Sequence, residues 1–141
     1  MRKGQIAIYY GAGKGKTSVS LGRGIRALGD DLRVVMIQFM DYHNHKEIAF
    51  LEKLEPDFRI FQFNFAKKIL DTGECDMLML DGILECIEEG YLTEAEVLEM
   101  LDKRSDSMDM ILTGNHLTDG IAQKADCIYQ IVPEKAGNVC S

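Results

Sequence analysis

The chain has 141 residues, of which 46% are hydrophobic, 28% are charged and only two are proline, so its composition excludes a disordered or fibrous protein and predicts one globular domain over residues 1–141. Its 23 Asp and Glu residues outnumber its 16 Lys and Arg residues, and the net charge of −7 disfavours nucleic acid as a partner. No apolar stretch approaches the ~20 residues of a membrane helix, so we expect a cytoplasmic protein that does not bind a membrane. The four cysteines lack zinc-ligand spacing and are expected to be free thiols.

The first expected element is an apolar strand at residues 5–10, which leads directly into a glycine-rich segment. This segment reads Gly11-Ala12-Gly13-Lys14-Gly15-Lys16-Thr17-Ser18, and a helix is expected over residues 17–28. Glycines allow several backbone N–H groups to converge on phosphate oxygens, and the start of the helix adds its positive end. The segment is therefore a candidate phosphate-binding loop, and we expect the chain to bind a nucleoside triphosphate such as ATP.

Two side chains of this loop have defined expected roles. Lys16 can reach the outer phosphates as a point charge, and the Thr17 hydroxyl can bind Mg²⁺. The general pattern has four residues between its first glycine and Gly-Lys-[Ser/Thr]. Here Gly11 and Gly15 are separated by only three, and Tyr10 stands where the first glycine would be. A Gly- and Lys-rich surface turn is the alternative interpretation, but the strand–loop–helix context favours phosphate binding.

Further along the chain, short apolar runs rich in β-forming residues alternate with segments of helical period. Strands are expected at residues 34–39, 59–63, 77–80, 110–113 and 128–132. Helices are expected at residues 17–28, 46–54, 82–89 and 117–124, and after the capping box Thr93-Glu94-Ala95-Glu96. This alternation predicts an α/β fold of the P-loop NTPase (RecA-like) type, with a mostly parallel sheet of five to six strands and helices on both faces.

Asp81 directly follows the apolar run at residues 77–80. A P-loop protein places a carboxylate beside Mg²⁺ at this carboxyl-terminal edge of the sheet. In the alternative interpretation, Asp81 caps the helix that follows it. Together with the loop, the pattern favours Thr17 and Asp81 as metal ligands and Lys16 and Asp81 as catalytic residues. Gly82 comes next, where many ATPases have a glutamate that polarises the attacking water.

Other polar and aromatic residues carry weaker signals. His43 and His45 form a His-x-His pair that we interpret as a solvated loop, because no further ligands have suitable spacing. His116 either lines the rim of the site or lies in a turn. The alternating phenylalanines of residues 58–65 favour core packing over an aromatic wall for a flat ligand, and the glutamates of residues 85–89 are expected to form a solvated helix face.

The shortened loop is similar to that of one family. Residues Gly11 to Thr17 resemble the Gly-[Asn/Asp]-Gly-Lys-Gly-Lys-Thr of the ATP:corrinoid adenosyltransferases, the P-loop type that adenosylates cobalamin precursors. Further similar positions are Gly22, Arg26-Ala27, Gly29, Gln38-Phe39, Leu80-Asp81, Gly90, Glu96-Val97-Leu98, Arg104, Leu112-Thr113-Gly114 and Ala125-Asp126. The resemblance extends over most of the chain.

The chain also departs from the pattern of that family. Lys-Gly, Asp-Glu and Thr-Gly-Arg in the family correspond here to Met40-Asp41, Asp81-Gly82 and Thr113-Gly114-Asn115. A helical segment between the third and fourth strands is expected to be largely missing between residues 68 and 76. The sequence ends at Ser141, before the Lys-His and Gly-Ile-Glu-Tyr patterns of the family. The nucleotide half of the site is therefore more similar to the family than the corrinoid half.

The resemblance implies transfer of the 5′-deoxyadenosyl group from ATP to a Co(I) corrinoid, with release of triphosphate and with Mg²⁺ as cofactor. Whether this activity survives depends on the changes at Met40, Gly82 and Asn115. An ATP-binding module or degenerate relative without transferase activity is the alternative. A small ATPase or kinase ranks last, because Gly82 leaves no base beside Asp81. The expected partners are ATP and a corrinoid, and a homodimer is left open.

Overall fold

The computed structural model of this protein describes residues 3–39 and 57–135, and leaves the side chains of residues 57–60 undescribed. Within these residues five strands form one parallel sheet in the order β2-β3-β4-β1-β5. The strands are β1 (Ile6–Tyr10), β2 (Val34–Gln38), β3 (Met77–Asp81), β4 (Asp109–Gly114) and β5 (Cys127–Gln130). The prediction of an α/β fold with a parallel sheet is confirmed.

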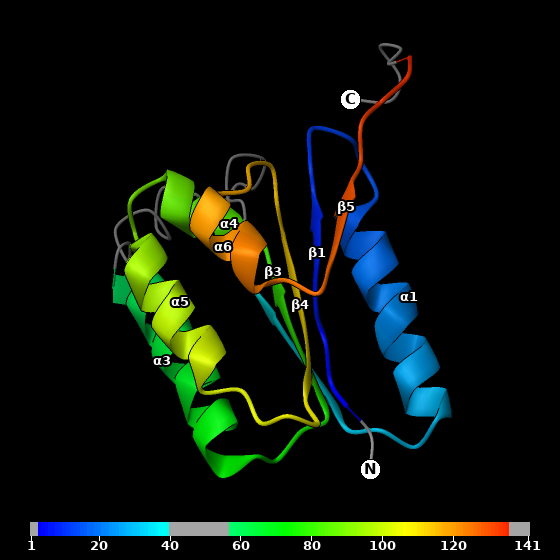
Figure 1. Ribbon diagram of the computed structural model, residues 1–141, viewed down its shortest axis with the longest axis vertical. Coiled ribbons are helices and arrows are strands. Elements are labelled where there is room, and N and C mark those ends of the chain that lie inside the picture. Colours follow the sequence, from blue (N-terminus) through cyan, green and yellow to red (C-terminus); the bar gives the residue numbers. More distant parts are fainter. Residues whose placement is uncertain (1–2, 40–56, 136–141) are drawn as a thin grey trace.

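Helices cover both faces of this sheet, as the sequence predicted. Figure 1 shows helix α1 on one side and helices α3, α4, α5 and α6 on the other. Their bounds are α1 (Lys16–Gly29), α3 (Asp57–Thr72), α4 (Ile83–Glu88), α5 (Glu94–Asp102) and α6 (Asp119–Lys124). The predicted capping box is present, because Thr93 Oγ1 accepts from the Glu96 N–H while the Glu96 carboxylate accepts from the Thr93 N–H.

Alternating side chains of the strands build two hydrophobic layers. On β1, Ile6 and Ile8 pack in the layer beneath α3 to α6, whereas Ala7 and Tyr9 pack beneath α1 with Ala27 of that helix. A strand buried on both faces reads as a continuous apolar run, which is the pattern of residues 77–80 and 110–112. The two layers thus bury the central strands that carry the loops at the edge of the sheet.

The predicted strand at residues 59–63 is wrong, because these residues lie in helix α3. The buried hydrophobic residues of this helix are Phe63, Ala66 and Leu70, which share one face at helical spacing. Phe61 and Phe65 are 65% and 48% exposed, so the alternation of aromatic residues did not mark a buried strand face.

Helix α3 also extends to Thr72, which corrects the expectation that a helical segment is largely missing between residues 68 and 76. The predicted helix at residues 46–54 lies outside the described residues, as do His43 and His45.

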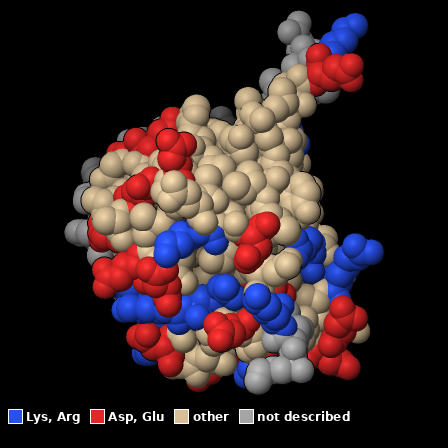
Figure 2. Space-filling view, viewed as in Figure 1, with Lys and Arg blue, Asp and Glu red and all other residues tan. Residues whose placement is uncertain are grey.

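Charged side chains are mixed in sign on the described surface. In Figure 2, Lys and Arg side chains are interspersed with Asp and Glu over the lower half of this face, while its upper central part is mostly uncharged. No helix in residues 3–39 and 57–135 is both long and apolar enough to cross a bilayer.

Candidate functional site

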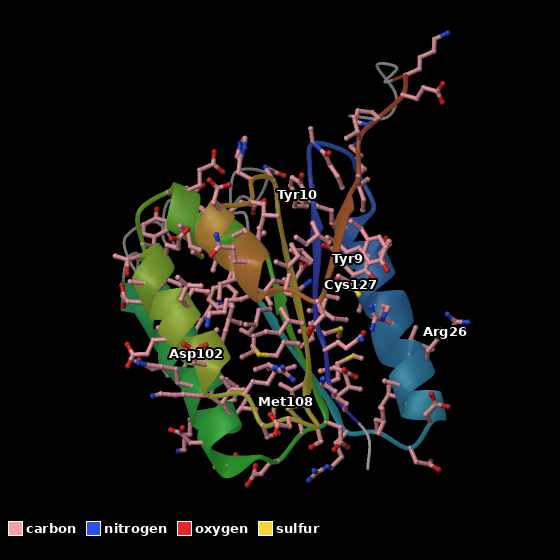
Figure 3. All side chains as sticks on the ribbon, in the orientation of Figure 1. Tyr9, Tyr10, Arg26, Asp102, Met108 and Cys127 are labelled. Atoms are coloured by element: carbon pink, nitrogen blue, oxygen red, sulfur yellow. The ribbon has the colours of Figure 1, made fainter. Side chains whose placement is uncertain are left out.

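The predicted site lies where the parallel strands end. Tyr10, the last residue of β1, and Met108, which precedes β4, lie at opposite ends of the sheet (Figure 3). The end of β4 lies between the ends of β1 and β3, since β4 pairs with both strands. The loop after β1 and the aspartate at the end of β3 are therefore separated by one strand, and loops at this edge are where open α/β sheets bind ligands.

The loop from Gly11 to Gly15 joins β1 to helix α1 through backbone conformations that favour glycine. Gly11 and Gly15 have φ angles of 126° and 108°, in the range that other residues rarely adopt. Gly13 approaches the chain after β5 so closely that an added Cβ would lie 2.6 Å from Ile131 Cγ2. The Gly13 N–H donates to the Ile131 carbonyl at 2.9 Å, and the Gly11 N–H donates to the Gly114 carbonyl at 3.1 Å. The loop is thus anchored to the ends of β4 and β5.

Lys16, the first residue of α1, points back across this loop. Its Nζ donates to the carbonyls of Gly11 at 2.6 Å and Gly13 at 3.0 Å, and to Asn115 Oδ1 at 3.1 Å. An ammonium group has three hydrogens, so these three acceptors use all of its donors. The lysine is held at the mouth of the loop, where a phosphate oxygen would take the place of one of these acceptors.

Asp81, at the end of β3, accepts hydrogen bonds from two hydroxyl groups. Thr17 Oγ1 lies 3.1 and 3.0 Å from the two carboxylate oxygens, and Thr113 Oγ1 donates to Oδ1 at 2.8 Å. The residue before α4 is Gly82, and no side chain caps this helix. The carboxylate therefore faces the loop residue Thr17, and the alternative interpretation of Asp81 as a helix cap is not what the geometry shows.

The pair of Thr17 and Asp81 has the chemistry that Mg²⁺ needs. A hydroxyl and a carboxylate supply oxygen ligands, and Mg²⁺ is usually bound by one or two carboxylates together with water and substrate phosphates. Residues 3–39 and 57–135 contain no group of three or more His, Cys, Asp or Glu residues that could hold a metal ion. The residues present thus fit a Mg²⁺ ion that arrives with a triphosphate.

The other predicted loop residues line the open side of the loop. Ala12, Lys14, Gly15 and Ser18 are exposed, so their backbone and side chains are accessible to a ligand. Of the three departures from the family pattern, Gly82 and Asn115 border the site, and Met40 lies outside the described residues.

The sequence interpretation did not assign a role to Thr113 or a contact to Asn115. The signal available was a polar residue directly after the apolar residues 110–112, at the end of a strand next to the loop. His116 follows Asn115 at the rim and pairs with Glu88 at 3.2 Å, with both side chains well exposed. Glu88 at the end of α4 and Glu89 directly after it are exposed as predicted, whereas Glu85 is half-buried.

Residues 2–137 match the family described as "ATP:corrinoid adenosyltransferase BtuR/CobO/CobP". This chain belongs to the ATP:corrinoid adenosyltransferase family. It is 27% identical over 154 aligned residues to the corrinoid adenosyltransferase of Escherichia coli K12, covering 94% of this chain and 79% of that protein. The corrinoid adenosyltransferase CobA of Salmonella typhimurium is similar to the same extent, and that of Pseudomonas aeruginosa is 23% identical, covering 92% of this chain and 75% of the relative.

Solved structures support the P-loop NTPase fold. Domain III of the replication initiation protein DnaA from Thermotoga maritima has a TM-score of 0.54 at 20% identity, covering 95% of this chain and 57% of that one. A chain of the Escherichia coli HORMA:CdnC:Trip13 complex has a TM-score of 0.55 at 12% identity, covering 95% and 50%. At these identities the likeness concerns the fold alone, and the family membership supports adenosyl transfer in general.

Proposed function

We propose that this protein transfers the 5′-deoxyadenosyl group of ATP to a Co(I) corrinoid and releases triphosphate. The observation that carries the proposal is the arrangement of Lys16 on one side of the β4 end and the Thr17–Asp81 pair on the other, in a chain of this family. Such an edge offers a cation to a polyphosphate and a pair of oxygen ligands to the Mg²⁺ ion that accompanies it.

In this reaction the Co(I) centre of the corrinoid substrate is the nucleophile. It gives an electron pair to C5′ of ATP and forms the Co–C bond, while the C5′–O bond breaks and its electron pair leaves with the triphosphate. No water or protein group needs to lose a proton in this step. The protein is therefore expected to act by holding C5′ in line with cobalt and by stabilising the charge that develops on the leaving triphosphate.

The residues of the loop supply this stabilisation in the proposal. Lys16 exchanges one of its carbonyl or amide acceptors for a phosphate oxygen, and the exposed loop residues Ala12, Lys14 and Gly15 offer backbone N–H groups. Lys14 adds a second positive charge near the same anion. Thr17 and Asp81 would hold Mg²⁺, which when bound neutralises part of the phosphate charge. The ribose C5′ is expected to face the carboxyl-terminal edge of the sheet, where a corrinoid can reach it.

An ATP-binding module without transferase activity is the second candidate, and one observation favours it. Gly82 has a φ of 83°, and a Cβ built there would lie 2.6 Å from the Phe39 carbonyl oxygen. Gly82 stands where the family has a glutamate, and the Phe39 backbone packs so closely against it that this chain has no room for the glutamate side chain. Asn115 likewise places a neutral amide where the family has an arginine.

The products of ATP distinguish these candidates. The protein is incubated with Mg²⁺, ATP and a chemically reduced corrinoid, and the phosphate products are separated by ion-exchange chromatography. Triphosphate that appears only when the corrinoid is present supports the transferase. ADP and phosphate would instead identify a hydrolase. Unchanged ATP together with measurable ATP binding would identify the binding module without transferase activity. Lys16→Ala is the control, since it removes the cation of the loop.

A further inference from the structure

Thr113 is a buried polar residue at the end of β4, and its side chain is 2% exposed. It lies beside Asp81 because β3 and β4 pair in register up to Leu80 and Leu112, the residues that precede these two. The hydroxyl makes two hydrogen bonds of good length, to the Gly82 N–H at 2.7 Å and to Asp81 Oδ1 at 2.8 Å.

The direction of these two hydrogen bonds follows from the donors available. A backbone N–H can only donate, so Thr113 Oγ1 accepts from Gly82. The single hydrogen of the hydroxyl is then directed to Asp81 Oδ1, and an ionised carboxylate accepts it. The two hydrogen bonds thus run in one direction, from the Gly82 amide to the Thr113 hydroxyl and from that hydroxyl to the Asp81 carboxylate. We call this chain of hydrogen bonds a relay, and it ends on the carboxylate that faces Thr17.

We propose that Thr113 is a positioning residue that fixes the rotation of the Asp81 carboxylate toward Thr17 and Mg²⁺. The inference rests on the proposed function of Thr17 and Asp81 as ligands of the metal that accompanies ATP. The last torsion of an aspartate is broad and roughly two-fold, so the side chain alone does not set the plane of its carboxylate. A hydroxyl from the neighbouring strand supplies that constraint, as outer partners of metal ligands commonly do.

Thr113→Val tests this relay because it keeps the shape of the side chain and removes its hydroxyl. ATP binding is titrated by calorimetry over a range of Mg²⁺ concentrations and also in EDTA. The Mg²⁺ concentration at half-maximal ATP binding is expected to rise by about 10- to 100-fold, the usual effect of losing an outer partner of a metal ligand. ATP affinity in EDTA is expected to stay at the wild-type value, because Thr113 contacts neither Lys16 nor the open side of the loop.

Thr118, which precedes helix α6, offers a control outside this relay. Its hydroxyl oxygen is buried and has no hydrogen-bond partner among the described residues, so Thr118→Val removes a buried hydroxyl without breaking a hydrogen bond. We expect Thr118→Val to keep the wild-type Mg²⁺ dependence. Thr113→Ser should restore it, since serine carries the same hydroxyl. If Thr113→Val does not fold, Thr113→Ser and Thr113→Ala are compared instead, because these two differ only in the hydroxyl.

Two results would overturn the inference. An unchanged Mg²⁺ dependence in Thr113→Val and Thr113→Ala would show that the hydroxyl does not position the metal ligand. Thr113→Val can also be added to Asp81→Asn. If it then shifts the Mg²⁺ concentration at half-maximal ATP binding as much as it does in the wild-type protein, Thr113 does not act through Asp81. If the wild-type protein itself does not bind ATP in the presence of Mg²⁺, the proposed function fails and the inference fails with it.

Discussion

Replacing Gly82 with alanine should destabilise this protein more than the same change at Gly90. Both glycines have a φ of 83°, a left-handed conformation that costs a residue with a Cβ roughly 1–2 kcal/mol. They differ in their surroundings. A Cβ at Gly90 meets nothing within 4 Å, whereas a Cβ at Gly82 would lie 2.6 Å from the Phe39 carbonyl oxygen, which belongs to the backbone and must shift.

The extra contact sets the size of the expected difference. Forcing an additional carbon into a packed site typically costs 1–3 kcal/mol, so we expect Gly90→Ala to lower the free energy of unfolding by about 1–2 kcal/mol and Gly82→Ala by about 2–5 kcal/mol. Urea unfolding followed by circular dichroism gives both values from the midpoint and the slope. Equal losses in the two variants would refute the reasoning, because they would show that the Phe39 carbonyl does not limit position 82.

The close contact between position 82 and Phe39 also bears on a variant that restores the glutamate of the family. Gly82→Glu adds a carboxylate beside Asp81, but it also displaces Phe39, whose N–H donates to the Asp81 carbonyl at 2.7 Å. We expect this variant to lose stability and to bind Mg²⁺ and ATP no better than Gly82→Ala. A gain in activity without a loss of stability would mean that the backbone at position 82 adapts to a side chain.

Three further predictions follow from contacts of the described residues. Thr93→Ala removes the capping box of α5 and should lower the free energy of unfolding by about 1 kcal/mol in urea without changing ATP affinity; a change in affinity would count against a purely local effect. Asn115→Asp places a carboxylate beside Lys16 Nζ and should weaken ATP binding by roughly five-fold in calorimetry, less at high salt, whereas tighter binding would contradict it. Burial raises the pKa of the Cys75 thiol and so lowers its thiolate fraction at a given pH; iodoacetamide should modify Cys75 only at higher pH than the more accessible Cys127, and equal rates near neutral pH by mass spectrometry would refute this.

The loop and Asp81 could be predicted because their signals are local in sequence. Glycines next to Lys16 and Thr17, and an aspartate at the end of an apolar run, are patterns that lie within a few consecutive residues. The strand at residues 59–63 was predicted wrongly because the alternation of Phe61, Phe63 and Phe65 outweighed the helical spacing of Phe63, Ala66 and Leu70. Only packing against the sheet decides which of these two patterns is buried.

The contacts of the β4 end could not be predicted in the same way. Thr113 meets Asp81 across 32 positions of sequence, and Asn115 meets Lys16 across 99. These contacts exist because β4 lies between β1 and β3, and that strand order is a property of the whole sheet. The sequence placed polar residues at the end of an apolar strand, but the partners of those residues follow from the topology.

The central claim is that the loop and Asp81 serve adenosyl transfer to a corrinoid, and formation of the Co–C bond tests it most directly. Wild-type protein, Lys16→Ala and Asp81→Asn are each mixed with Mg²⁺, ATP and a reduced corrinoid, and the adenosylated product is followed by its absorption spectrum and its sensitivity to light. We expect product with the wild-type protein, formed in equal amount to released triphosphate, and little or none with either variant. ATP binding by the wild-type protein without any Co–C bond formation would contradict the claim and identify an ATP-binding module.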